Sequence, residues 1–354
     1  MRKIKRYIDL IQEARMLEGE NVPVIPLVFK MLYWIHVNHG RILFFLFLGL
    51  HKKENKIRDY ITEKDFLRIH RELNSPYYLP VLEDKYLCDR FLRSFGFPLA
   101  ESIGLLENGI ITWIPERKAE SIEGIVHHTM NCYCKLILGW GGNRVYKLEI
   151  CDGLLTINNK VSDLEELKSL TNKGIYILQK TVVQHAEMNR LNPSCVNTVR
   201  IITIHDGQIV HELGSFLRIG IGDSHVDNIS SGNLACGIHE DGSLYKTATD
   251  AYFEKGWLTS HPTTNTTFAT FTIPYYKEAL ELARQMHKAF HCFFIVAWDI
   301  AITETGPVVI EANPPADIIW IQAYRGGLKK EFLRYALRYR ETKKIHKTLK
   351  PVLK

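Results

Sequence analysis

The segment from Phe293 to Asp317, FFIVAWDIAITETGPVVIEANPPAD, contains the pattern that decides the fold. Two apolar runs flank the tripeptide Glu304-Thr305-Gly306, which predicts an antiparallel β-hairpin. A three-residue hairpin loop needs positive φ at its last position, and glycine adopts that conformation without steric cost. With the short alternating strands upstream, this hairpin indicates an α+β protein built from antiparallel sheets.

The register of this hairpin brings two carboxylates together. With a three-residue loop, Thr303 pairs with Pro307, and the even register places Asp299 directly opposite Glu311. Directly opposed residues have Cβ atoms ~5 Å apart, so like charges repel each other there. Two carboxylates within apolar runs therefore need a cation.

Asn313 adds a third oxygen donor on the same face, two residues beyond Glu311. Oxygen donors without a nearby histidine or cysteine favour a hard ion, so we expect magnesium to be bound by Asp299, Glu311 and Asn313. The alternative is that the carboxylates are solvated on an outer sheet face, with Asn313 capping the next turn. The apolar neighbours Trp298 and Ile310 favour the metal site.

The pattern D-x(11)-E-x-N across a final hairpin resembles the ATP-grasp superfamily. More narrowly, HPTTNTTFATFTIPYYKEALELARQMHKAF (261–290) followed by AWDIAITETGPVVIEAN (297–313) is similar to the sugar-transfer-associated ATP-grasp family, which is related to α-L-glutamate-ligase-like proteins. The resemblance extends from about Asp84 to Asp317. It implies an ATP-grasp fold, in which two α/β lobes with antiparallel sheets enclose ATP and Mg²⁺, with Mn²⁺ as a substitute.

A glycine cluster follows an alternating strand that ends at Lys135. Backbone N–H groups of Gly139, Gly141 and Gly142 can approach phosphates closely, and a neighbouring lysine neutralises charge. An ordinary strand-joining turn explains the cluster equally well. The resemblance assigns Lys135 and this loop to the nucleotide phosphates, and Lys85 to the second nucleotide lysine; the alternative for Lys85 is a surface helix charge.

The run Ile175–Gln184, IYILQKTVVQ, resembles the linker strand that holds adenine between the two lobes. Gln179, Lys180 and Val182 would lie there. Gln179 stands where many relatives carry glutamate. An ordinary strand explains the same pattern, because adenine recognition through main-chain atoms leaves little trace in the sequence.

Two arginines lie on the strands of a hairpin that turns at Asp206-Gly207. Arg200 and Arg218 are each surrounded by apolar residues, and a buried guanidinium requires an anion. The structural explanation is a buried pair with Glu212 or Asp227. The resemblance implies instead that both arginines bind the γ-phosphate or the carboxylate being activated.

Two further residues match family motifs that continue differently here. Asn228 resembles the asparagine near the phosphates, but relatives continue with two glycines where this chain has Gly232-Asn233. His261 matches an HP motif that relatives continue with Asp-Thr-Gly rather than Thr263-Thr264-Asn265. His261 is a candidate substrate contact or a turn histidine.

The chain of 354 residues is long enough for several subdomains around one cleft. We expect an N-terminal helical region over 1–80, an ATP-grasp domain over 81–335 and a basic tail over 336–354. Within the domain, the nucleotide lobe spans about 120–180 and the catalytic lobe about 181–335. Helices are expected at 84–95, 162–171 and 275–290.

Composition limits the class of partner and the compartment. A formal charge of +6 suits an anionic partner but does not require nucleic acid. Seven scattered cysteines without a CxxC pair indicate a reducing compartment, and the start of the chain lacks the features of a signal peptide. These features predict a cytoplasmic protein.

The run Ile42–Leu50, ILFFLFLGL, is about half of the ~20 apolar residues that a spanning helix needs. It predicts a buried helix, with an amphipathic segment on the inner face of a membrane as the alternative. Peripheral membrane or glycosyltransferase association is the partner hypothesis that follows from this alternative and from the family.

The resemblance implies an ATP-dependent carboxylate–amine ligase that acts through an acyl phosphate. The family name suggests polysaccharide or cell-surface glycan biosynthesis, with an amino acid or amine joined to a carboxylated sugar. A peptide-type ligase acting on a small metabolite, a kinase-like enzyme and a non-catalytic ATP-binding scaffold are the alternatives.

Overall fold

The computed structural model describes residues 11–12, 23–37, 39–41, 43–139, 141–314 and 316–343. Trp140 of the glycine cluster lies outside the described residues, as does most of the predicted helical segment before residue 23. The predicted basic tail is described only as far as Lys343.

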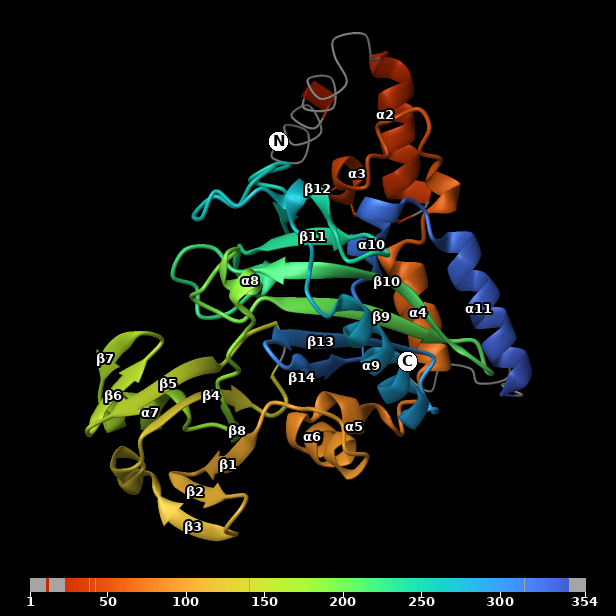
Figure 1. Ribbon diagram of the computed structural model, residues 1–354. Helices are drawn as coiled ribbons and strands as arrows, with labels where there is room; N and C mark the ends of the chain where they lie inside the picture. The colour runs from red at the N-terminus through yellow and green to blue at the C-terminus, as the bar shows by residue number, and fades with distance from the viewer. Residues whose placement is uncertain are drawn as a thin grey trace.

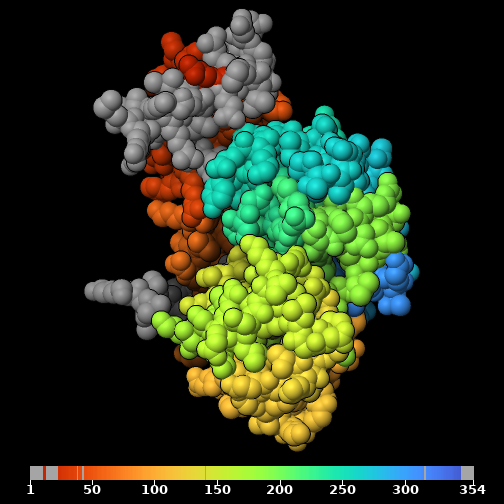
Figure 2. Space-filling view, turned by 90° about the vertical axis from the view of Figure 1, so that its left-hand side faces the viewer, coloured from red at the N-terminus to blue at the C-terminus, as the bar shows by residue number. Residues whose placement is uncertain are grey.

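The first sheet has eight antiparallel strands and forms the lower lobe in Figures 1 and 2. Its spatial order is β3-β2-β1-β8-β4-β5-β6-β7. The strands are β1 (Ser102–Glu107), β2 (Ile110–Trp113), β3 (Lys118–Ser121), β4 (Met130–Leu136), β5 (Val145–Cys151), β6 (Leu154–Ile157), β7 (Lys160–Ser162) and β8 (Ile175–Lys180). The first strand of this sheet begins at Ser102, about 20 residues before the predicted start of the nucleotide lobe at 120. It belongs to the sheet because β1 pairs with the linker strand β8.

The second sheet has six antiparallel strands in the order β12-β11-β10-β9-β13-β14. The strands are β9 (Thr198–His205), β10 (Val210–Ile219), β11 (Leu234–Ile238), β12 (Leu244–Asp250), β13 (Ile295–Thr303) and β14 (Gly306–Asn313). Every residue of β9 is buried, because helices cover both faces of this sheet. The predicted α+β class with antiparallel sheets is confirmed.

Helices surround the second sheet on both faces (Figure 1). On one face, α9 (Tyr276–Ala289) packs against the strands; on the other lie α4 (Glu63–Leu73), α10 (Ile318–Arg325) and α11 (Lys329–Thr342). The remaining helices and single turns are α2 (Val24–Leu32), η1 (Tyr33–Val37), α3 (Leu43–Phe47), η2 (Ile57–Asp59), α5 (Leu79–Glu83), α6 (Lys85–Ser94), η3 (Ile122–His127), α7 (Leu164–Leu170), α8 (Ala186–Asn189), η4 (Ile229–Ser231) and η5 (Phe268–Thr270). The three helices expected at 84–95, 162–171 and 275–290 are therefore present as α6, α7 and α9.

The apolar run around α3 is part of the core. Phe45, Leu46, Phe47 and Leu48 are each at most 4% exposed and belong to the cluster that includes Phe332 of α11. The prediction of a buried helix is confirmed, and the membrane alternative for this run is wrong because its side chains pack inside the protein, where Phe47 contacts Trp257 and Trp320. Among the described residues, every helix is too short or too polar to cross a bilayer.

One buried asparagine joins the N-terminal helices to the second sheet. Asn74, at the end of α4, donates its side-chain amide to the carbonyl of Ile295 at 2.8 Å. Its side-chain oxygen accepts from the N–H groups of Phe294 and Ile295 at 2.8 and 3.1 Å. These contacts satisfy the backbone where β13 begins and fix the helix against it.

We expect Asn74→Ala to lower the free energy of unfolding by about 2–4 kcal/mol, because several buried backbone groups lose their partner. Urea unfolding measures the difference. Gln285→Ala on the exposed side of α9 is the control and should change stability by less than about 0.5 kcal/mol. Equal midpoints for the two variants would contradict the assigned role of Asn74.

Candidate active site

The terminal hairpin places Asp299 directly opposite Glu311, as the sequence predicted. The route to this register differs from the prediction. Thr303 pairs with Gly306 rather than with Pro307, so the predicted pairing was wrong and the loop has two residues. Gly306 does adopt positive φ, at 119°.

A β-bulge restores the opposition of the two carboxylates. Ile300 pairs with Val309, so Ile310 is the extra residue between that pair and the pair of Asp299 and Glu311. A bulge adds one residue to one strand, which offsets the residue that the shorter loop lacks. The two differences cancel, and the carboxylates face each other.

Asp299 is neutralised by two arginines on neighbouring strands. Nε of Arg200 on β9 lies 2.6 Å from Oδ1 of Asp299, and Nη2 lies 2.6 Å from Oδ2. Nη1 of Arg218 on β10 also donates to Oδ2, at 2.6 Å, and Nδ2 of Asn313 donates to it at 3.1 Å. Burial acts to raise the pKa of Asp299, but the two guanidinium groups outweigh it and hold that pKa below its usual value. In the structure, these arginines supply the positive charge that Asp299 requires.

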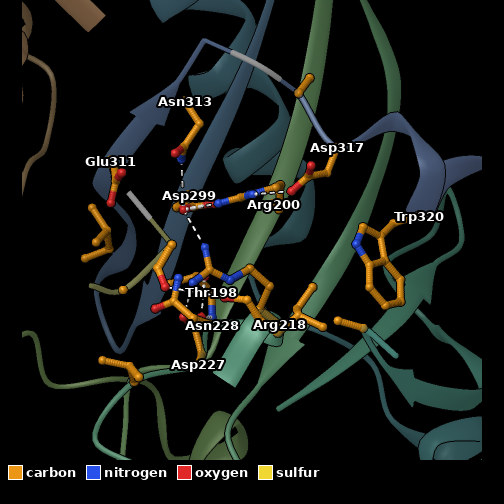
Figure 3. Close-up of a pocket in the computed structure, with 18 of the residues that line it drawn as sticks. Thr198, Arg200, Arg218, Asp227, Asn228, Asp299, Glu311, Asn313, Asp317 and Trp320 are labelled. Carbon is orange, nitrogen blue, oxygen red and sulfur yellow. Dashed lines mark hydrogen bonds and ion pairs between the residues drawn. The ribbon is translucent and has the colours of Figure 1, made fainter. Parts of the chain in front are cut away.

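The arginines extend this contact into a chain of alternating charges (Figure 3). Nη1 of Arg200 lies 3.2 Å from Oδ2 of Asp317, and Nη2 of Arg218 donates to Oδ1 of Asp227. Burial raises the pKa of Asp227, and Arg218 opposes that shift. We call the series Asp317, Arg200, Asp299, Arg218 and Asp227 the charge chain. Of the two anions that the sequence left open for the arginines, Arg218 binds Asp227.

Glu311 is less constrained than Asp299. Its Oε1 lies 3.6 Å from Nζ of Lys85, and its side chain is 27% exposed against 3% for Asp299. Lys85 is the first residue of α6, whose N-cap Asp84 accepts hydrogen bonds from the N–H groups of Tyr86 and Leu87. This cap fixes the start of the helix and therefore the origin of the Lys85 side chain.

Lys135 approaches the same region from β4. Its Nζ donates to Oε1 of Gln179 at 3.0 Å and lies 5.6 Å from the centre of the Tyr133 ring. The residue is 9% exposed, and burial lowers the pKa of Lys135 to about 8. Gln179 in turn donates to the hydroxyl of Ser102. It therefore positions the Lys135 side chain in the cavity.

The glycine loop packs against the other lobe. Gly141 and Gly142 have φ values of 64° and 76°, and a Cβ on Gly142 would lie 2.7 Å from Cγ of Asn228. With its amide oriented to satisfy its neighbours, Asn228 accepts from Gly142 N–H at 3.2 Å and from Nη2 of Arg218 at 3.0 Å. Position 142 therefore requires glycine, because of both its positive φ and the nearby Asn228 side chain. At the start of the loop, Nζ of Lys85 donates to the carbonyl of Gly139 at 2.6 Å.

These groups line one cavity of about 540 Å³ between the two lobes, a volume typical of ligand sites. Thirteen of the fifteen residues selected from the sequence line it: Lys85, Lys135, Gly139, Gly141, Gly142, Lys180, Val182, Arg200, Arg218, Asn228, Asp299, Glu311 and Asn313. Gln179 lies behind Lys135 and is not among the lining residues.

His261 lies away from the cavity. It is 0% exposed, and its Nε2 lies 2.8 Å from the carbonyl oxygen of Gly220. Its Nδ1 accepts from the N–H groups of Thr263 and Thr264 at 3.4 and 3.3 Å. Of the two roles that the sequence left open, the geometry favours the turn histidine.

The lining residues that were not assigned a role from the sequence include Asp317, Trp320 and Thr198. Thr198 donates its N–H to Asp227 at 2.9 Å and so fixes one end of the charge chain. Asp317 is the last residue of the segment 293–317, so its closeness in sequence to Glu311 and Asn313 could have predicted a place in the site. Trp320 on α10 carried no comparable signal, since an apolar helix residue is usually core.

The donor set fits a magnesium ion. From the described residues, Oδ1 of Asp299 accepts one hydrogen bond, from Arg200, which leaves a lone pair for a cation. Glu311 is partly exposed and lies opposite, and Asn313 contacts Asp299. The part of the chain that the structure describes has no cluster of three or more His, Cys, Asp or Glu residues with metal-site geometry, so this oxygen set with one amide is the best candidate there.

Residues 67–334 match the model of a protein family described as sugar-transfer-associated ATP-grasp. This chain belongs to that family. The resemblance inferred from the hairpin and the HP motif is therefore confirmed. No curated protein sequence is significantly similar to the chain.

Similar solved structures include ATP-grasp enzymes at low identity. An N5-carboxyaminoimidazole ribonucleotide synthetase in complex with ADP is 13% identical, with a TM-score of 0.42, over 72% of this chain and 52% of that one. The ATP-grasp ligase PsnB with a minimal precursor, Mg and ADP is 16% identical, with a TM-score of 0.39, over 75% and 62%. The D-alanine–D-alanine ligase of Bacillus anthracis is 12% identical, with a TM-score of 0.41, over 74% and 70%. The match thus spans less than two thirds of the first two chains.

We expect Asp299→Asn to destabilise this ATP-grasp protein by about 3 kcal/mol or more, because two buried guanidinium groups lose their shared counter-ion. Thermal unfolding with calorimetry measures this change. The matched control is Asp317→Asn, which removes the other partner of Arg200. Its side chain is 57% exposed, so its loss should cost less than about 1 kcal/mol. Equal stability of wild type and Asp299→Asn would refute the central place of Asp299.

Proposed function

We propose that this chain is an ATP-dependent ligase that joins a carboxylate to an amine through an acyl phosphate. The observation that carries the proposal is the charge chain, which lies in one cavity with Lys85, Lys135 and the glycine loop. Membership of the ATP-grasp family supports it, because this family consists generally of ATP-dependent ligases. Phosphoryl transfer depends on positioning and on neutralising charge, and the cavity offers both.

Charge balance supports a metal-bound nucleotide as the ligand. In the cavity lining around Asp299, four carboxylates (Asp227, Asp299, Glu311, Asp317) are matched by four cations (Lys85, Lys135, Arg200, Arg218). A triphosphate adds about four negative charges, so it needs counter-ions of its own. In our proposal Asp299, Glu311 and Asn313 bind Mg²⁺, with Mn²⁺ as a substitute. The bound metal supplies charge neutralisation for the triphosphate.

The remaining residues take roles that follow from their positions. Lys85, Lys135 and the N–H groups of Gly141 and Gly142 bind phosphate oxygens. Lys180 and Val182 border the adenine at the end of the linker strand, where main-chain groups are available. Arg200, Arg218 and Asn228 hold the acyl phosphate and stabilise the charge that develops on it.

No protein nucleophile is part of the proposed reaction. Among the described cysteines, Cys88, Cys132, Cys134, Cys195 and Cys236 are buried, and burial raises the pKa of each thiol. Protonated thiols are poor nucleophiles. A carboxylate activated by phosphorylation needs only an amine, which suits this cavity.

The acid substrate that we favour is a carboxylated sugar or glycan, since the family is described as sugar-transfer associated. An amino acid or another amine would be the second substrate. We place the reaction in the cytoplasm, where ATP is available and thiols stay reduced; all seven cysteines are free. If this chain associates with a glycosyltransferase, its product would pass directly to that enzyme.

The test of the reaction is ADP release in the presence of uronic acids, singly and combined with amines. ADP that forms only when acid and amine are both present supports the ligase. ADP formed with a sugar alone would identify a kinase, and bound ATP without any turnover would identify a scaffold. Mass spectrometry of the amide product identifies the two substrates.

We expect Glu311→Gln to lower kcat by about 100-fold or more and to raise the Mg²⁺ concentration needed, because a charged ligand to the metal is lost. The free energy of unfolding should change little, since the one ionic partner of Glu311 among the described residues is Lys85, at 3.6 Å. Glu304→Gln is the matched control on the same hairpin, and its side chain is 61% exposed. Equal activity of both variants would exclude Glu311 as a metal ligand.

Nucleotide affinity should fall as pH rises through about 8. Burial lowers the pKa of Lys135, so this lysine is charged below that pH and loses its charge above it, about two units before an ordinary lysine. The Kd for AMP-PNP should rise about tenfold between pH 7 and pH 9.5, which corresponds to the loss of one charged contact. Lys135→Arg keeps its charge over this range and should remove most of the dependence. A Kd for the wild-type protein that is constant up to pH 9.5 would contradict the prediction.

A further inference from the structure

The cavity has a second end that is apolar and lies beyond the charge chain. Its walls there include Phe44 of α3, Ile61 before α4, Phe66 of α4, and Ile319 and Trp320 of α10. Ile61, Phe66 and Trp320 are at most 7% exposed, so their side chains are held by the core while part of their surface faces the cavity. This end is suited to an apolar group rather than to a phosphate.

The N-terminal part of this wall lies outside the family match. That match begins at residue 67, whereas Phe44, Ile61 and Phe66 precede it. The wall is nevertheless attached firmly to the catalytic lobe. The side chain of Gln322 accepts from Ile61 N–H at 2.8 Å and donates to Ile61 carbonyl at 3.0 Å.

The exposed carboxylate of Asp317 lies between the apolar end of the cavity and the arginines. The side chain of Asp317 is 57% exposed, and its Oδ2 lies 3.2 Å from Arg200. In the view of Figure 3, Asp317 and Trp320 lie on the other side of Arg200 from Glu311 and Asn313. A second charged pair, Arg41 with Glu63 at 2.6 Å, is also part of the cavity lining.

We infer that this end of the cavity binds the amine substrate, and that this amine carries an apolar side group. Its ammonium pairs with the exposed oxygens of Asp317, next to the arginines that hold the acyl phosphate. Its apolar group packs against Phe44, Ile319 and Trp320. The inference rests on the proposed function and adds the chemical class of the second substrate. A carboxylate or phosphate is disfavoured at this end, because it would meet the carboxylate of Asp317 and a mainly apolar wall, while Arg41 is already paired with Glu63.

The test compares two amines of equal charge that differ in their apolar group, L-phenylalaninamide and glycinamide. Each is titrated by calorimetry into the full chain saturated with AMP-PNP and Mg²⁺, so no acid substrate is needed. Burying an aromatic group should make L-phenylalaninamide bind at least tenfold tighter than glycinamide. Similar Kd values for the two amines would overturn the inference.

Variants assign the effect to this end of the cavity. Phe44→Ala and Ile319→Ala should each reduce the preference for L-phenylalaninamide about three- to tenfold, and Asp317→Asn should weaken both amines about tenfold without changing their ratio. Phe29→Ala is the matched control, since Phe29 is 69% exposed on α2 and does not line this cavity. An unchanged preference in both wall variants would place the apolar contact elsewhere and refute the inference.

The same titration separates this inference from the proposed function. The Kd for AMP-PNP is measured first for every protein, which also verifies that each variant is folded. If AMP-PNP fails to bind the wild-type chain, the proposed function falls and the amine site falls with it. If AMP-PNP binds but the two amines are equivalent, only the amine site is refuted.

Discussion

Two guanidinium groups buried in one β-sheet determine the arrangement of this site. Arg200 and Arg218 lie on adjacent strands among apolar residues and cannot remain unpaired there. Asp299, on the strand next to Arg200, meets both of them. The pairing of β9 with β10 and β13 brings the three side chains together, so the core and the candidate catalytic centre share one electrostatic requirement.

This requirement changes how the acidic pair is understood. The sequence indicates correctly that a carboxylate at position 299 needs a positive charge, and it identifies both arginines as needing an anion. It does not indicate that these two needs meet, because strand pairing between β9 and β13 joins residues 99 positions apart. Long-range register is therefore the information that a single sequence lacks, whereas the local hairpin is readable from its turn and its alternation.

Other features divide in the same way. The buried character of the run around α3 follows from its length, which is too short for a bilayer. Helix positions near 85, 164 and 276 follow from periodicity and caps. By contrast, the burial of His261 in a turn and the part that Phe44 and Phe66 play in the cavity depend on which elements pack together. These contacts are properties of the assembled core and leave no mark on the local pattern.

Because of the bulge next to Asp299, the opposition of Asp299 and Glu311 does not depend on the length of the hairpin loop alone. A shorter loop is compensated by one extra residue, Ile310, before the strands reach Asp299 and Glu311. A homologue with one inserted residue at the tip could dispense with the bulge and keep the same opposition. The acidic pair can thus tolerate one inserted residue at the turn, so a longer loop at this exposed position need not signal a loss of the pair.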